Sequence, residues 1–202
     1  WYSHFYKYSP DSRSTNHNDN KFTSLFINYM FSQSAFFDLK ISNNKKSDYA
    51  YVYEDPSDSR YVSDFFSRSE SSFLQGGHDK NHNTKILEDL SLKFDLNWQA
   101  DPINNIKFGL DYVAHDLLIN NYTIRDSSLT DIVYTPYIDK GVRSAYSEEY
   151  DVTCYEFSAY LQDKMEFSDM VLNFGLRYDM FDPNTIYPSD YRNPANDIIG
   201  VA

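Results

Sequence analysis

The sequence predicts an all-β fold, arranged as an antiparallel meander. Two observations support this prediction: apolar and polar residues alternate with a period of two in several segments, and short polar turns join these segments in pairs. A period of two places successive side chains on opposite faces of a strand, and a short turn can join only antiparallel neighbours. We therefore expect about seven strands, each paired with its neighbours in sequence.

The N-terminal segments predict one strand followed by a hairpin. Residues 1–8 have the pattern of a strand, so we expect the chain, which starts at Trp1, to be a piece of a longer protein. A hairpin follows over 21–53, with a turn at Ser32-Gln33-Ser34. Its first strand places on one face Thr23, Leu25, Ile27, Tyr29 and Phe31, and its return strand places on one face Phe37, Leu39 and Ile41. The less regular segment 43–48 is compatible with a bulge.

A second hairpin is predicted around the turn at 100–105. The strand before this turn places on one face Leu90, Leu92, Phe94, Leu96 and Trp98. The strand after it sets one apolar row, Ile106, Phe108, Leu110, Tyr112 and Ala114, against Lys107, Gly109, Asp111, Val113 and His115. Each strand thus has one apolar and one mostly polar face.

The third hairpin, near the C-terminus, has the clearest alternation. Its first strand has an apolar row of Tyr155, Phe157, Ala159, Leu161, Met165 and Phe167, which only Asp163 interrupts. After the turn at Ser168-Asp169, a second apolar row consists of Met170, Leu172, Phe174, Leu176, Tyr178 and Met180. We expect Met170, Leu172, Phe174, Leu176 and Tyr178 to face lipid, and Asn173, Arg177 and Asp179 to face a polar lumen.

The spacers between hairpins are longer than the turns within them. Residues 54–84 and 126–149 are rich in Ser, Asp and Asn, and contain Gly76-Gly77 and Pro136. Such loops are uncommon in compact soluble domains, whereas outer-membrane barrels alternate short turns with long loops. A strand of about 13 residues, tilted by about 40°, rises roughly 34 Å and crosses an apolar band of about 25 Å. The pattern therefore predicts part of a transmembrane β-barrel.

Composition agrees with a barrel and excludes several other classes. Aromatic residues make up 18% of the chain although mean hydropathy is -0.63, and no run approaches the roughly 18 apolar residues of a membrane helix. Large aromatic residues lie toward strand ends, as in an interfacial girdle: Tyr29, Phe31, Trp98, Tyr112, Tyr155, Phe167 and Tyr178. The net charge of -12 argues against a nucleic-acid partner, and the single Cys154 excludes an internal disulfide.

Two phrases around the last turn match a known family. The first runs from Phe157 to Lys164 and contains Tyr160, Gln162 and Asp163; the second runs from Leu172 to Asp179 and contains Gly175, Leu176, Arg177, Tyr178 and Asp179, before Phe181-Asp182-Pro183. This pairing of Y-x-Q-D with G-L-R-Y-D resembles the barrel of TonB-dependent receptors. The abundance of Tyr, Asn, Ser and Lys resembles receptors of the Bacteroidota.

The resemblance implies a barrel of about 22 strands with a plugged lumen, in the outer membrane of a Gram-negative bacterium. Such a receptor imports a scarce solute (a siderophore, glycan, peptide or vitamin-like ligand) and uses no cofactor. The implied partners are outer-membrane lipid, the receptor's own plug domain and TonB. We interpret residues 1–202 as a partial barrel without the plug, and expect no enzymatic activity.

The sequence leaves several candidate sites open. His78 and His82 share a loop with Asp79 but lack a third metal ligand at a suitable spacing, and the acidic residues Glu54, Asp55, Asp58 and Asp64 lack the spacing of a calcium loop. We therefore predict no metal site. No catalytic triad, phosphate loop or carboxylate pair stands out. Arg177 and Asp179 fit either a lumenal ion pair that contacts a plug or a cross-strand charge pair.

Two other classes of function compete with a receptor. Another outer-membrane barrel, an enzyme or a porin, would share the strands, and an enzyme would need a catalytic set at its rim. A soluble β-sandwich binding module would have shorter strands and a second sheet over the apolar face.

Overall fold

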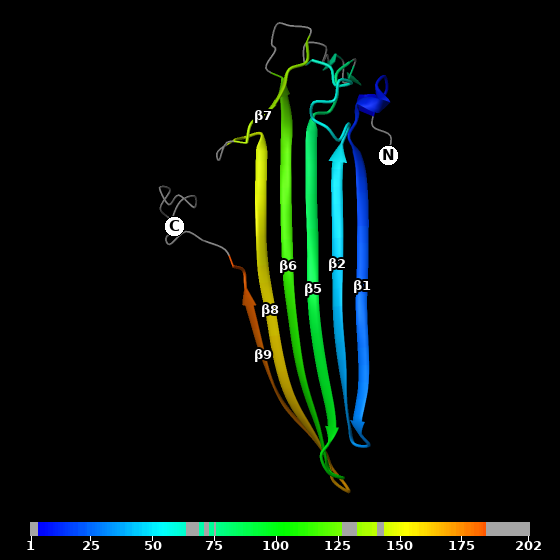
Figure 1. Ribbon diagram of the computed structural model, residues 1–202, viewed down its shortest axis with the longest axis vertical. Helices are drawn as coiled ribbons and strands as arrows, with labels where there is room; N and C mark the ends of the chain where they lie inside the picture. Colours follow the sequence, from blue (N-terminus) through cyan, green and yellow to red (C-terminus); the bar gives the residue numbers. More distant parts are fainter. Residues whose placement is uncertain are drawn as a thin grey trace, which may run out of the picture. The chain divides into compact units, whose positions relative to one another are not determined.

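The structure, a computed structural model, describes residues 4–63, 69–70, 73–74, 76–126, 133–140 and 144–184. The long strands are β1 (Thr15–Ser32), β2 (Ala35–Tyr51), β5 (Asn81–Gln99), β6 (Asn104–Asp126), β8 (Ser147–Glu166) and β9 (Val171–Asp182). They form one sheet in sequence order (Figure 1), and the short β7 (Pro136–Ile138) pairs with β6. The predicted all-β antiparallel meander is therefore confirmed.

Short turns close the three predicted hairpins. The turn between β5 and β6 is held by the carboxylate of Asp101, which accepts hydrogen bonds from the backbone N–H groups of Ile103 (2.8 Å) and Asn104 (2.9 Å). In the turn between β8 and β9, the N–H of Phe167 donates to the carbonyl oxygen of Met170 at 2.8 Å. Polar turn residues thus satisfy backbone groups that the strands leave unpaired.

The N-terminal strand predicted over residues 1–8 is wrong for residues 4–8, and residues 1–3 lie outside the described part. His4–Tyr6 form the 3-10 helix η1, and Pro10–Ser12 form η2, where Pro10 favours a tight turn. The rings of His4 and Tyr8 contact Phe73, at centroid distances of 4.8 and 5.5 Å. Phe73 belongs to β4 (Phe73–Leu74), which pairs with β3 (Ser69–Glu70). His4 and Tyr8 thus pack on this small hairpin.

Several strands are longer than predicted. β5 begins at Asn81 and β6 continues to Asp126, and the segment expected as a spacer before residue 149 contains β7 and the start of β8. β2 runs without interruption through 43–48, where the sequence is compatible with a bulge. Polar side chains of these extensions bond across strands, as in the hydrogen bond from Asn18 Nδ2 to Asp48 Oδ1 at 2.6 Å. Hydrophobic alternation understates the lengths of β1, β5 and β8 because the first residues of these strands are polar.

The chain divides into two compact units. Unit 1 comprises residues 1–21, 45–87 and 117–151, and unit 2 comprises 22–44, 88–116 and 152–202. The division falls within the long strands, so all of these except β9 contribute residues to both units. Among the described residues, the buried apolar or aromatic side chains are Tyr61, Leu74 and Ile124 in unit 1 and Ala35 in unit 2. The small core therefore lies mostly in unit 1.

Candidate functional site

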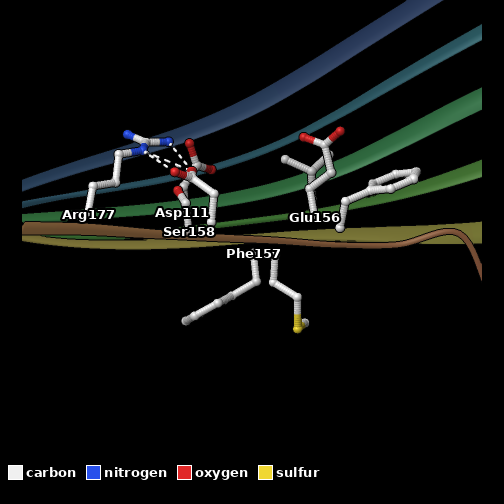
Figure 2. Close-up of a pocket in the computed structure, with 9 residues that line it drawn as sticks. Asp111, Glu156, Phe157, Ser158 and Arg177 are labelled. Atoms are coloured by element: carbon white, nitrogen blue, oxygen red, sulfur yellow. Dashed lines mark hydrogen bonds and ion pairs between the residues drawn. The ribbon is translucent and has the colours of Figure 1, made fainter.

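The register of β8 and β9 separates two faces of unit 2. Leu161 lies opposite Leu176 and Met165 opposite Leu172, whereas Tyr160 lies opposite Arg177. Figure 2 shows the same division: Asp111, Glu156, Ser158 and Arg177 project from one side of the sheet and Phe157 from the other. We call these two sides of unit 2 the polar face and the apolar face.

The apolar face continues across the sheet of unit 2 through a chain of ring contacts. Centroid distances are 5.7 Å for Tyr29–Phe37, 5.6 Å for Phe37–Phe94 and 6.4 Å for Phe94–Phe108, with Tyr112–Tyr155 at 6.3 Å. Its side chains are most exposed on β9, where Phe174 is 63% and Leu176 70% exposed, whereas Phe94 and Phe108 are half-buried. Within the described residues, no second layer covers this face.

The apolar face has defined limits along the strands. At one limit, its rows end in polar pairs: Asn43 Nδ2 donates to Glu88 Oε1 at 2.8 Å, and Thr153 Oγ1 donates to Asp116 Oδ1 at 2.5 Å. At the other limit, the rows end at the short turns. Between these limits the apolar row of β5 runs from Leu90 to Trp98, about the 9–11 residues with which a β-strand crosses a bilayer.

Most of the aromatic residues expected in a girdle are also exposed. The exposed ones are Tyr29, Phe31, Trp98, Tyr112, Phe167 and Tyr178, while Tyr155 is half-buried. This exposure is what contact with lipid headgroups requires.

On the polar face, Tyr160 of the first phrase lies over a glycine. A Cβ on Gly109 would overlap the Tyr160 ring and lie 2.8 Å from Asp95 Oδ1. The absence of a side chain lets the ring cross β6, so that its hydroxyl donates to Asp95 Oδ1 on β5 at 2.8 Å. Sequence reasoning selected Tyr160 by resemblance and missed Asp95 and Gly109. Asp95, Gly109 and Tyr160 all occupy polar-face positions of their strands, and this was the signal in the sequence that could have linked them.

Arg177 and Asp179 form their ion pair along one strand. Arg177 Nε lies 2.9 Å from Asp179 Oδ1, and Nη2 lies 2.8 Å from the same atom. This geometry differs from the cross-strand pair that the sequence left open. The two side chains, with Asp111, Glu156 and Ser158, line a hollow of about 310 Å³ (Figure 2). The hollow contains more carboxylates than cations, so it favours positively charged groups.

A histidine beside this hollow contacts two carboxylates. His115 Nδ1 lies 2.6 Å from Asp89 Oδ1, and its Nε2 lies 3.7 Å from Glu156 Oε1. Sequence reasoning did not find the partners of His115, because its contact with Asp89 joins residues 26 positions apart. The Asp89 bond fixes the orientation of the imidazole ring.

The two family-like phrases lie opposite each other. Besides the Tyr160–Arg177 and Leu161–Leu176 pairs, the register places opposite each other Gln162 and Gly175, Asp163 and Phe174, Ala159 and Tyr178, and Ser158 and Asp179. Gln162 lines a second hollow, of about 230 Å³, with Asn97 and Asn105. Asp163 interrupts the apolar face, and its Oδ1 is buried without a hydrogen-bond partner among the described residues.

In unit 1, His82 is the centre of a tyrosine–histidine cluster, which we define as Tyr51, Tyr61, His82 and Tyr122. His82 Nε2 lies 3.0 Å from the Tyr61 hydroxyl, and Nδ1 lies 3.2 Å from the Tyr122 hydroxyl. Its ring stacks on Tyr122 at 5.0 Å and on Tyr51 at 5.8 Å. Because hydroxyls engage both nitrogens, His82 is not available for the metal site that the sequence left open with His78.

Two acidic residues of the first long loop, Asp55 and Asp58, form hydrogen bonds within its turns. Arg60 donates to both oxygens of Asp58, at 2.9 and 2.6 Å, and this pairing lowers the pKa of Asp58 to about 2. Asp55 accepts a hydrogen bond from the backbone N–H of Ser57 at 2.8 Å. Asp64 lies outside the described residues. Across the described residues, no group of three or more His, Cys, Asp or Glu side chains is arranged to hold a metal ion.

No protein-family model and no curated protein sequence matches this chain. In the described part of the chain, no helix has the length and hydropathy needed to span a membrane.

Proposed function

We propose that this chain forms part of the wall of an outer-membrane β-barrel, and that the whole protein is a TonB-dependent receptor that imports a scarce solute. The observation that carries the proposal is the apolar face of unit 2, which is exposed and bounded at both ends by polar groups or turns. In this proposal the apolar face contacts lipid and the polar face lines the lumen. The membrane-spanning segments are the strand portions of unit 2.

Energetics favour lipid over water for this face. Each Leu, Phe or Met side chain that stays exposed to water lacks about 1.5–3 kcal/mol of stabilisation that full burial would give, and the face contains several such residues. Their sum is comparable to the 5–15 kcal/mol that stabilises a typical domain. A soluble sandwich would need a second sheet over this face, and the described residues supply none. In a bilayer, hydrocarbon covers the face and removes the cost.

The paired phrases on β8 and β9 support a receptor in particular. Tyr160 and Gln162 face Arg177 and Gly175 across the last hairpin, so the two phrases lie on strands joined by a tight turn, as the family resemblance implies. The charged polar face suits a lumen filled by a plug and water. Siderophores, glycans, peptides and vitamin-like molecules remain the proposed solute classes.

A barrel enzyme is the second candidate, and the Asp89–His115 bond is the observation that favours it. A carboxylate that orients a histidine is a common arrangement for a general base. However, no serine or threonine of the described residues hydrogen-bonds to His115 Nε2. The receptor therefore accounts for more of the structure.

Environment-sensitive labels can test the wall. The full-length protein with Cys154→Ser would carry single cysteines at Leu172, Phe174 and Leu176 or at Asn173, Arg177 and Asp179, each labelled with a bimane dye in bilayers. Lipid-soluble quenchers should quench the first set, and aqueous quenchers the second. Equal quenching of both sets would overturn the barrel wall.

Crosslinking can test the receptor. Formaldehyde treatment of cells that produce the full-length protein should link it to TonB. Correct dye quenching without a TonB crosslink would leave a barrel wall but reject the receptor.

A further inference from the structure

The segment 52–63, which we call the strap, follows β2 in unit 1 and is attached to the tyrosine–histidine cluster through Tyr61. Tyr61 is 2% exposed and His82 is 4% exposed, although both are polar. The Tyr61 hydroxyl also lies 3.2 Å from both the backbone N and the carbonyl O of Tyr53. The Tyr61 hydroxyl therefore connects two residues of the strap, Tyr53 and Tyr61, to His82 at the start of β5.

Hydrogen-bond counting assigns a single protonation state to this arrangement. If the Tyr61 hydroxyl donates to the Tyr53 carbonyl, it accepts from the Tyr53 N–H and from His82 Nε2–H. His82 Nδ1 then accepts from the Tyr122 hydroxyl. Every group is satisfied when His82 is neutral and carries its proton on Nε2, a tautomer assigned from the network.

Protonation of His82 would break this match. Nδ1 would become a donor, and the Tyr122 hydroxyl would lose its acceptor. A positive charge would also be enclosed among rings at a site almost without solvent exposure, where charge is costly unless it is paired. Opening the strap would return the imidazolium to water and relieve both costs.

We propose that His82 is a pH-sensitive pin: when neutral it holds the strap closed, and protonation of its ring opens the strap. The strap contributes Ser57, Ser59, Tyr61 and Ser63 to the lining of a hollow of about 560 Å³, which Val133, Tyr134 and Pro136 also line. Opening the strap therefore changes access to this hollow. The inference does not depend on the proposed transport function.

Several titratable or charged groups surround this pin. Tyr61 faces His82 from the strap, Tyr51 from β2 and Tyr122 from β6. Asp79 and Lys80 precede it in sequence, and two further groups act on Tyr122: Asp55 electrostatically and Lys140, whose ammonium lies 6.0 Å from the ring. Of these, Asp79 is the group that favours the charged imidazole.

The direction of the pH effect follows from burial. Burial lowers the pKa of His82 below its ordinary value, and Asp79 offsets this only in part. Burial, and then Lys80, also lower the pKa of His78. In the open strap the His82 ring returns to an ordinary pKa near 6.5, so the open state binds protons more readily. The closed state is fully favoured above about pH 6.5 and loses this advantage as the pH falls toward the lowered pKa.

Hydrogen exchange read by mass spectrometry tests the pin in the detergent-solubilised protein. After correction for intrinsic rates, amides of 52–63 should exchange faster at pH 5 than at pH 7.5, by up to about tenfold for each pKa unit of lowering. Exchange at the imidazole carbon, in the same samples, should give His82 a midpoint that coincides with the loss of strap protection. Protection that is equal at both pH values, or a different midpoint, would overturn the proposal.

Variants separate His82 from other histidines. His82→Gln should remove the pH dependence, whereas His17→Gln should preserve it, because His17 also stacks on Tyr51 but is exposed. His78→Gln should preserve most of it. If His78→Gln abolished the dependence and His82→Gln did not, the assignment to His82 would be wrong. If His82→Gln fails to fold, the coincidence of midpoints in the unaltered protein still decides.

Discussion

The two units are built largely from the same strands, yet large side chains are enclosed in unit 1 and exposed in unit 2. In unit 1, loops fold onto the strands and enclose Tyr61, His82 and Ile124. In unit 2, the connections are short turns, and Phe174 and Leu176 remain exposed. The period of two is common to both units, so alternation alone does not determine what covers a face. The length and composition of the connections determine it.

Truncating one aliphatic side chain in each unit should give the largest difference in stability between the two units. Ile124 is 1% exposed and Leu176 is 70% exposed. Ile124→Ala should reduce the free energy of unfolding by about 2–5 kcal/mol, because it leaves a cavity. Leu176→Ala in detergent should reduce it by only about 1–2 kcal/mol, because detergent fills the space that the side chain leaves and no cavity forms. Urea titration measures both, and similar losses would show that the face of unit 2 is enclosed after all.

Adding charge to adjacent residues of β9 tests the two faces of unit 2. Leu172 lies opposite Met165 on the apolar face, and Asn173 lies opposite Lys164 on the polar face. In bilayers, Leu176→Arg near mid-membrane should cost about 2–4 kcal/mol and Leu172→Arg, beside the turn, up to about 1 kcal/mol, whereas Asn173→Arg should be mild. Reversible folding into phospholipid vesicles gives the free energies. Equal costs would contradict the assignment of lipid to one face.

The packing of Tyr160 offers a smaller test within unit 2. Gly109→Ala should displace the Tyr160 ring and break its bond to Asp95, at a cost of about 1–3 kcal/mol. Gly175→Ala is the matched control, since its added Cβ would lie 3.3 Å from the Leu161 carbonyl oxygen and meet no ring. Denaturant unfolding of both variants in detergent measures the difference. A larger loss for Gly175→Ala would contradict this account of Tyr160.

The smallest effect is expected at the exposed ion pair. Arg177 and Asp179 are more than half exposed, so solvent screens their attraction. Arg177→Gln should change the free energy of unfolding by less than about 1 kcal/mol, and added salt should reduce the difference further. A loss that salt leaves unchanged would indicate that Arg177 has a role in packing.

Local pattern was sufficient to predict the hairpins and the two faces of unit 2. The row from Leu172 to Tyr178 needs only the pleat of a strand to share one face, and the turn at Ser168-Asp169 needs only nearby residues. The same reasoning failed for residues 4–8, where aromatic residues at strand-like spacing pack on Phe73. Alternation identifies a face but does not identify its partner.

The sequence by itself therefore determined the meander, the last hairpin and the division of polar from apolar residues on β5, β6, β8 and β9, because each depends on neighbours a few positions apart. Only the tertiary structure decided the partners of His82, Tyr160 and His115. Tyr122 and His82 are 40 positions apart, and Tyr160 and Asp95 are 65 apart. Such contacts depend on the exact register of the strands and on loops that fold back, whereas alternation specifies only which residues of a strand share a face.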